Sequence, residues 1–91
     1  MRAVGAIVRG RVQGVGYRAW TEQQATALGL DGWVRNRRDG TVEAQIVGPD
    51  AGVDMLLTRL HQGPPGSRVE AVEVTVAQTM AQPGFHVLPT V

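Results

Sequence analysis

Apolar and polar residues alternate along several stretches of the chain, as expected for β-strands that bury one face. The first alternation predicts a strand over residues 3–12, where valine and alanine are separated by glycine and arginine. A second strand candidate covers residues 31–36 and precedes Asp39-Gly40, a dipeptide typical of a tight hairpin turn. Beyond that turn, alternation over residues 41–46 predicts the returning strand.

Two other stretches repeat their apolar residues at helical spacing. The first begins at Tyr17 and continues to Leu28, and Gly29 follows it as a stop signal. The second is an amphipathic helix for which Asp50 is the expected N-cap, and it ends before two prolines that cannot continue a helix. Its apolar stripe follows the i, i+3, i+4, i+7 spacing and consists of Val53, Leu56, Leu57 and Leu60.

The last part of the chain predicts two more strands. Four valines between positions 69 and 76 indicate one strand, with a change of phase near Ala71 that we interpret as a bulge. A loop over residues 77–84 follows, and residues 85–88 are expected to form a short edge strand.

The predicted order is β-α-β-β-α-β followed by that edge strand. It is typical of a ferredoxin-like α+β fold, a split βαβ arrangement with an antiparallel-rich sheet and both helices on one face. Residues 1–91 then form a single domain. The first two strands of this topology run parallel with the third between them. The loop after the first strand and residues 35–38 after the second should therefore lie close together.

The composition excludes several kinds of chemistry. The chain has no cysteine and no lysine, which rules out a disulfide framework, a thiolate nucleophile and a lysine Schiff base. His61 and His86 lack ligand spacing, so we expect no metal site. A net charge of +1 gives no sign of a nucleic-acid or membrane partner. The N-terminal stretch, interrupted by Arg9, is neither a signal peptide nor a membrane span, and we expect a cytoplasmic protein.

The stretch GRVQGVGYR joins the first strand to the first helix. Gly10, Gly14 and Gly16 allow successive N–H groups to turn toward one point, and such a turn at a helix N-terminus can bind an anion. Arg18 supports this interpretation, because a cation in the first turn opposes the helix dipole by roughly 0.3–1 kcal/mol unless an anion binds. The alternative is a plain strand-to-helix turn with Arg18 in solvent near Glu22.

The same glycines also match part of the dinucleotide-binding fingerprint. Gly14, Gly16 and Ala19 satisfy G-x-G-x-x-A between a strand and a helix. The acidic residue expected about 20 positions later is missing, because residues 34–36 read VRN. The second strand also leads into a hairpin, and the chain is too short for two mononucleotide-binding halves. A dinucleotide site is therefore not predicted.

Two segments resemble the signatures of the acylphosphatase family. GRVQGVGYR resembles its G-x-V-Q-G-V-x-F/Y-R motif, and GWVRNRRDGTVEAQIVG resembles its second motif, which carries an asparagine between glycines. The resemblance implies a hydrolase of small acyl phosphates that acts as a monomer, without a metal or another cofactor. It also implies that Arg18 binds the phosphate and Asn36 holds the attacking water. The loop amides that complete the phosphate site would be those of Gln13, Gly14, Val15, Gly16 and Tyr17.

The composition of the second motif favours a functional role for Asn36. Asp39-Gly40 already supplies the turn, so the asparagine is not needed for it. The other notable side chains have simpler expected roles. These are a solvent-facing position for Arg35, Arg37 and Arg38, and packing in or beside the core for Tyr17, Trp20 and Trp33.

The C-terminal segment departs from the family pattern. Many members end in a Phe-x-x-Arg-Tyr-like sequence that helps to place the catalytic arginine, whereas Leu88 and Pro89 follow Phe85 at the corresponding places here. The resemblance therefore does not predict C-terminal support for Arg18. Gly16 is an additional glycine, which we expect to make the loop more mobile until phosphate binds.

Two other functions are compatible with the same fold. An RNA-binding module would need exposed aromatic residues on its central strands, and the predicted third strand has none. A weakly catalytic or non-catalytic domain that binds acyl or carbamoyl phosphate is the second alternative, since a related domain occurs within a larger hydrogenase-maturation protein.

Overall fold

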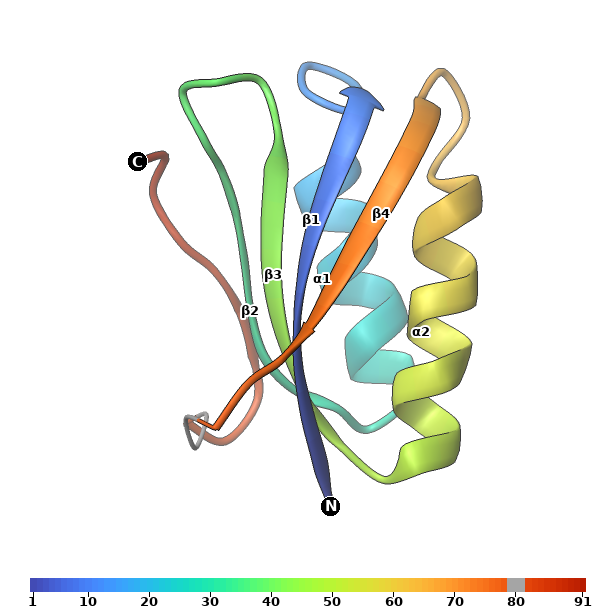
Figure 1. Cartoon of the computed structure of the whole chain (residues 1–91), viewed down its shortest axis with the longest axis vertical. Helices are drawn as coiled ribbons and strands as arrows, with labels where there is room; N and C mark the ends of the chain where they lie inside the picture. The colour runs from blue at the N-terminus through green and yellow to red at the C-terminus, as the bar shows by residue number, and fades with distance from the viewer. Residues whose placement is uncertain (79–81) are drawn as a thin grey trace.

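The computed structural model describes residues 1–78 and 82–91, and its elements follow the predicted order (Figure 1). Part of the loop predicted at 77–84 lies outside the described residues. Neither helix in the described part of the chain is long and apolar enough to cross a membrane. The strands are β1 (Arg2–Arg11), β2 (Asp31–Asn36), β3 (Val42–Gly48), β4 (Arg68–Val76) and β5 (Phe85–Val87), and the helices are α1 (Tyr17–Ala27) and α2 (Asp50–Gln62).

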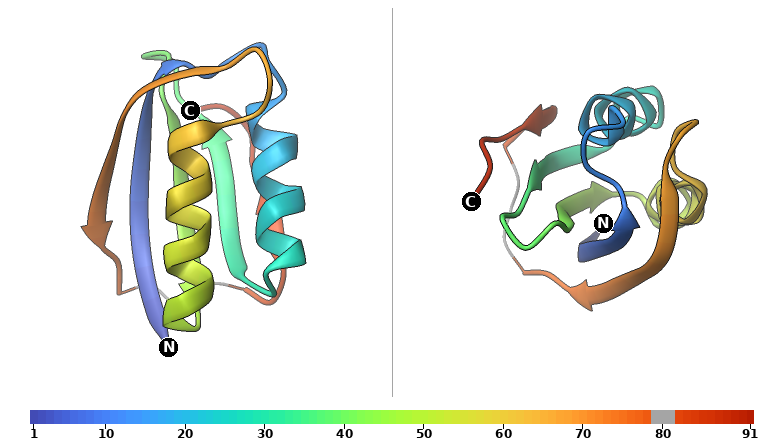
Figure 2. Two further views of the ribbon diagram at one scale, coloured as in Figure 1. Left: turned by 90° about the vertical axis from the view of Figure 1, so that its right-hand side faces the viewer. Right: turned by 90° about the horizontal axis from the view of Figure 1, so that it is seen from above.

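The strands form one mixed sheet in the order β4-β1-β3-β2-β5. β3 is antiparallel to both β1 and β2, so these two flanking strands run in the same direction. β4 pairs antiparallel with β1, and β5 pairs parallel with β2. Both helices cover one face of the sheet (Figure 2), which confirms the ferredoxin-like fold. The carboxyl ends of β1 and β2 consequently lie at the same end of the sheet.

The core lies between the helices and the inner face of the sheet. Strand alternation turns every second residue of β1 and β3 inward, where the side chains meet the apolar stripes of the helices. Each fully buried aliphatic side chain contributes about 1.5–3 kcal/mol relative to an exposed one. The largest contributors from sheet and helices are Val8, Val34, Val42, Ile46, Val53, Leu56 and Leu60, all essentially inaccessible.

A β-bulge at the start of β4 confirms the phase change predicted near Ala71. Arg9 pairs with Ala71 and Gly10 pairs with Val69, which leaves Glu70 outside the register. A Cβ atom on Gly10 would lie 2.1 Å from the Arg68 carbonyl oxygen, so this position requires glycine for close strand approach. The prediction that Gly10 belongs to the anion-binding turn is therefore wrong, because the residue lies within β1.

The start of α2 differs by one residue from the sequence prediction. Pro49 occupies the N-cap position and no side chain within residues 1–78 and 82–91 caps the helix, whereas Asp50 is the first helical residue. The prediction of Asp50 as the N-cap is thus wrong. Its carboxylate still lies in the first turn, where a negative charge interacts favourably with the helix dipole.

Candidate active site

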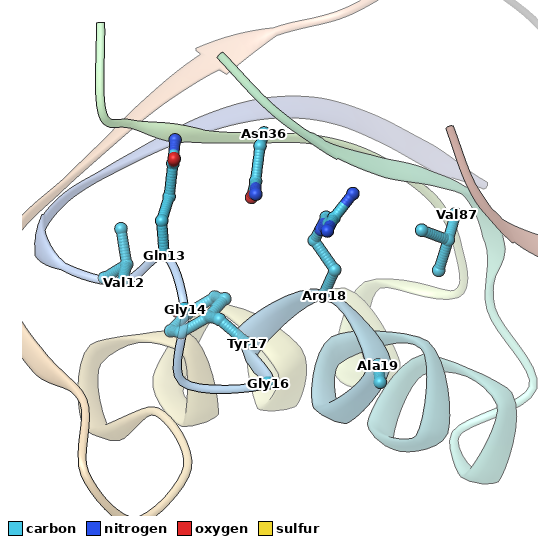
Figure 3. A pocket seen from close by; sticks show the side chains of 9 residues that line it. All are labelled: Val12, Gln13, Gly14, Gly16, Tyr17, Arg18, Ala19, Asn36 and Val87. Atoms are coloured by element: carbon cyan, nitrogen blue, oxygen red, sulfur yellow. The ribbon is translucent and has the colours of Figure 1, made fainter. Parts of the chain in front are cut away.

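A pocket of about 270 Å³ lies beside the N-terminus of α1, where the carboxyl ends of β1 and β2 meet. Of the residues predicted from the sequence, Gln13, Gly14, Gly16, Tyr17, Arg18 and Asn36 line it (Figure 3). The fold therefore brings together two segments that are separated by the whole of α1. Residues that sequence reasoning missed also line the pocket: Val12, Ala19 and Val87.

Val15 is the predicted loop residue that does not line the pocket. Its side chain is half-buried and packs against the hydrophobic core. Val15 can therefore take part in the predicted phosphate binding only through its backbone N–H. Sequence reasoning could not find Val87, because β5 reaches the pocket through its parallel pairing with β2 and not through any local motif.

The loop before α1 exposes backbone donors. Gly14 and Gly16 have φ values of 75° and 77°, in the left-handed region that favours glycine. A Cβ at either position would have no atom of the described part of the chain within 4 Å, so backbone conformation and not lack of space requires glycine there. Gly16 is the N-cap of α1 and no side chain of the described residues caps the helix, which leaves first-turn N–H groups to face the pocket or solvent.

The Arg18 side chain has no hydrogen bond or ion pair within residues 1–78 and 82–91. It is half-buried in the first turn of α1, a turn that contains no acidic residue. Glu22, one turn later, does not pair with it. A half-buried guanidinium at the positive end of a helix is electrostatically unfavourable, and an anion in the pocket would remove that penalty.

The Asn36 side chain presents the second unsatisfied group. Asn36 is the last residue of β2, and its Oδ1 atom is buried and accepts no hydrogen bond within the described part of the chain. A buried acceptor without a donor costs about 1–3 kcal/mol. The side chain lies across the pocket from Arg18 (Figure 3), so the two unsatisfied groups border the same space.

The C-terminal segment supports Asn36 and not Arg18. The Val91 N–H donates to the Asn36 carbonyl oxygen at 3.1 Å, and the Arg38 N–H donates to the Val91 carbonyl oxygen at 2.8 Å. The Leu88 N–H donates to the Val34 carbonyl oxygen at 2.9 Å, which continues the pairing of β5 with β2. The segment that departs from the family pattern therefore holds the backbone that carries the asparagine.

The side chain of Tyr17 anchors the start of α1. Its hydroxyl donates to the Leu60 carbonyl oxygen at 2.6 Å, in the last turn of α2, and its ring contacts Trp20 with a centroid separation of 5.4 Å. Burial raises the pKa of the Tyr17 hydroxyl above its ordinary value. The predicted packing roles of Tyr17 and Trp20 are confirmed, since the first is buried and the second packs against the core.

Charged residues on the outer face of the same hairpin pair with one another. The Arg35 Nε donates to Glu43 Oε1 at 2.8 Å, and its guanidinium lies 4.6 Å from the centre of the Trp33 ring. Arg37 Nη1 lies 3.5 Å from the other carboxylate oxygen of Glu43. Arg35 thus lies on the outer face of the sheet, away from the pocket as predicted, although its pairing leaves it only partly exposed, whereas Arg38 is exposed.

The family model for acylphosphatase matches residues 4–87. An acylphosphatase of Mesorhizobium japonicum is 57% identical over 83 residues, which cover 91% of this chain and 88% of that protein. An acylphosphatase of Bradyrhizobium diazoefficiens is 53% identical over 91 residues, covering 93% of this chain and 92% of that protein. The crystal structure of acylphosphatase from Bacillus subtilis superposes with a TM-score of 0.91 at 35% identity and covers 97% of this chain and 99% of its own.

The same fold also occurs inside a much larger protein. The crystal structure of full-length HypF contains a region that superposes with a TM-score of 0.84 at 23% identity. That region amounts to 12% of the HypF chain, although it covers 98% of this one. At this identity the similarity shows a shared fold alone.

Proposed function

The chain belongs to the acylphosphatase family and is a hydrolase of acyl phosphates, and from this premise we propose a role for each polar group of the pocket. The phosphoryl group binds at the N-terminus of α1. The Arg18 guanidinium contacts two of its oxygens, because the planar fork matches that geometry, and the N–H groups of residues 13–17 contact the others. The bound dianion then interacts favourably with both the helix dipole and Arg18.

Asn36 orients the attacking water. The observation that carries this assignment is its Oδ1 atom, which is buried beside the pocket and has no hydrogen-bond donor among the described residues. A water that donates one hydrogen to this oxygen is held with a lone pair free for attack. A neutral amide suffices, because the acyl phosphate carries its own good leaving group and the enzyme mainly positions the reactants.

The reaction then forms one bond to phosphorus and breaks another. The water oxygen attacks phosphorus, and the bond between phosphorus and the bridging oxygen breaks in line with the attack. The leaving carboxylate keeps the electron pair of that bond. Phosphate and solvent take up the water protons, while Arg18 and the loop amides stabilise the charge on the equatorial oxygens.

Isotope labelling tests both the reaction and its independence of metal. The protein would hydrolyse acetyl phosphate in H₂¹⁸O with EDTA present, beside a sample without protein that measures uncatalysed hydrolysis. We expect rapid turnover with one ¹⁸O atom in phosphate and none in acetate. Label in acetate would show attack at the carbonyl carbon instead, and loss of turnover with EDTA would show that a metal is required.

A binding measurement tests the two residue roles separately. Titration of inorganic phosphate by calorimetry should show much weaker binding to Arg18→Ala than to the wild type. Asn36→Ala should bind phosphate nearly as the wild type does, because its proposed ligand is the water. Equal loss in both variants would contradict the division of roles.

The oligomeric state and location belong to the same proposal. Arg18 and Asn36 meet at one pocket of a single domain, and we propose that the protein acts as a monomer. Light scattering should give a molar mass near 9.7 kDa, and twice that value would contradict the proposal. A cytoplasmic location stays a prediction from the sequence.

A further inference from the structure

The two halves of the pocket are joined by a side-chain hydrogen-bonding bridge. One half is the loop that precedes α1, with Arg18 beyond it, and the other is the end of β2 with Asn36. The Gln13 side chain leaves the loop and reaches the β2–β3 hairpin (Figure 3). Its Nε2 atom donates to the Arg37 carbonyl oxygen at 2.7 Å and to the Thr41 carbonyl oxygen at 2.9 Å.

These two carbonyl groups also close the hairpin itself. The Arg37 N–H donates to the Thr41 carbonyl oxygen at 2.9 Å, and the Gly40 N–H donates to the Arg37 carbonyl oxygen at 3.1 Å. A carbonyl oxygen accepts two hydrogen bonds, so each of these oxygens is fully used by one backbone donor and Gln13. The bridge is thus part of the hairpin's hydrogen-bonding and not a loose surface contact, since Gln13 is half-buried.

We propose that Gln13 is a positioning residue whose side chain sets the distance between the phosphate site and the water held by Asn36. The inference rests on the proposed function, which places phosphate at the loop and water at Asn36. Asn36 directly precedes Arg37, so a shift of the Arg37 carbonyl relative to the loop moves the asparagine relative to the phosphate. In-line attack depends steeply on that separation, and displacement by about 1 Å can lower a rate by about 10²-fold.

The geometry argues against the Gln13 side chain as a phosphate ligand. Both hydrogens of the Nε2 amide are used by the hairpin carbonyls. The remaining Oε1 atom is an acceptor and would repel phosphate oxygens. The side chain therefore acts on the hairpin, while the backbone N–H of Gln13 stays available for the phosphoryl group.

Gln13→Met tests the bridge, because methionine has a similar length and no amide to donate. We expect kcat to fall by roughly 10-fold or more through misplacement of the water, while the dissociation constant of inorganic phosphate stays within about 3-fold of the wild type. Gln24→Met is the matched control. The Gln24 Oε1 atom accepts from Arg59 at 2.8 Å, between the helices and away from the pocket, so this variant should keep the wild-type kcat.

Gln13→Glu tests whether kcat can be restored by lowering the pH, because protonation of the glutamate returns a hydrogen-bond donor to the bridge. An ionised glutamate cannot donate and faces two carbonyl oxygens, whereas a protonated one can donate to either of them. The ratio of its kcat to that of the wild type should therefore rise as the pH falls from 7 toward the ordinary glutamate pKa of about 4.3. Circular dichroism at each pH would show that both proteins are folded.

The outcomes separate this inference from the proposed function. Wild-type kcat in Gln13→Met, or a pH-independent ratio for Gln13→Glu, would overturn the positioning role. Weaker phosphate binding in proportion to the loss of rate would show that Gln13 acts through the phosphate site instead. If Arg18→Ala and Asn36→Ala retain full activity, the proposed roles of Arg18 and Asn36 fail, whatever the Gln13 variants do.

Discussion

Two neighbouring residues at the end of β2, one on each face of the strand, differ in whether their side chains have partners. Arg35 points to the outer face, where it donates to Glu43 and stacks on Trp33. Asn36, the next residue, lies on the pocket side, and its Oδ1 atom has no partner among the described residues. Arg18 also has no hydrogen-bond or ion-pair partner among the described residues, although it is an arginine like the well-paired Arg35.

The difference teaches how to distinguish structural from functional polar groups in this fold. A cation whose charge is balanced by protein groups can stabilise the folded chain without a ligand. A cation or amide without a protein partner beside a pocket lowers the stability of the folded chain, and it contributes favourable interactions only when a ligand binds. We therefore expect substitutions on the two faces to have opposite effects on activity and stability.

The largest expected effect is that of Arg18→Ala. Loss of the guanidinium that stabilises a transferring phosphoryl group should lower kcat/KM by about 10³-fold or more. The free energy of unfolding should stay equal or rise by roughly 0.3–1 kcal/mol, because a cation no longer opposes the dipole of α1. Phosphate release and urea unfolding measure the two quantities. A clear loss of stability would show that Arg18 has a structural partner.

Asn36→Ala should have the next largest effect on the rate. We expect kcat to fall by about 10²-fold through loss of water alignment, with KM nearly unchanged. Its free energy of unfolding should stay equal or rise by up to about 1–3 kcal/mol, because the substitution removes a buried acceptor that has no donor among the described residues. Steady-state kinetics on benzoyl phosphate gives both constants. An increase in KM with an unchanged kcat would instead assign Asn36 to substrate binding.

Arg35→Ala should reverse this pattern. The variant keeps both unsatisfied groups of the pocket, so its kcat/KM should remain within about 2-fold of the wild type. It loses the bond to Glu43 and the contact with Trp33, and the free energy of unfolding should fall by about 1 kcal/mol. Urea unfolding beside a kinetic assay would measure both. A large loss of activity would break the distinction between the two faces.

The smallest effect concerns pH and the hairpin turn. Hydrogen bonds from the Thr41 hydroxyl and N–H hold the pKa of Asp39 below its ordinary value. A lowered pKa in the folded state means that the contribution to stability is present above about pH 4 and is lost as the pH falls further. Asp39→Asn should show a shallower decrease of thermal stability between pH 5 and 2. Equal slopes in the two proteins would contradict this role for Asp39.

Local sequence determined much of the fold. Alternation over residues 41–46 and the stripe from Val53 to Leu60 match the observed β3 and α2, because the burial of one face imposes periods of two and 3.6 residues. The boundary of α2 was less predictable, since Pro49 and Asp50 are both compatible with a helix start. The role of Gly10 was also hidden, because it depends on a contact with the distant strand β4.

The sequence by itself determined which chemical groups are available: a loop with two glycines at the start of a helix, one arginine after it, and an asparagine at the end of the next strand. Tertiary structure decided which groups remain unsatisfied. RNRR reads as one polar run, yet strand pairing turns Arg35 toward Glu43 and Asn36 toward the pocket. The tertiary structure also brings the Gln13 side chain to the hairpin and the backbone of Val91 to that of Asn36. These contacts join residues far apart in the chain, and their energies depend on distance and direction that local sequence does not encode.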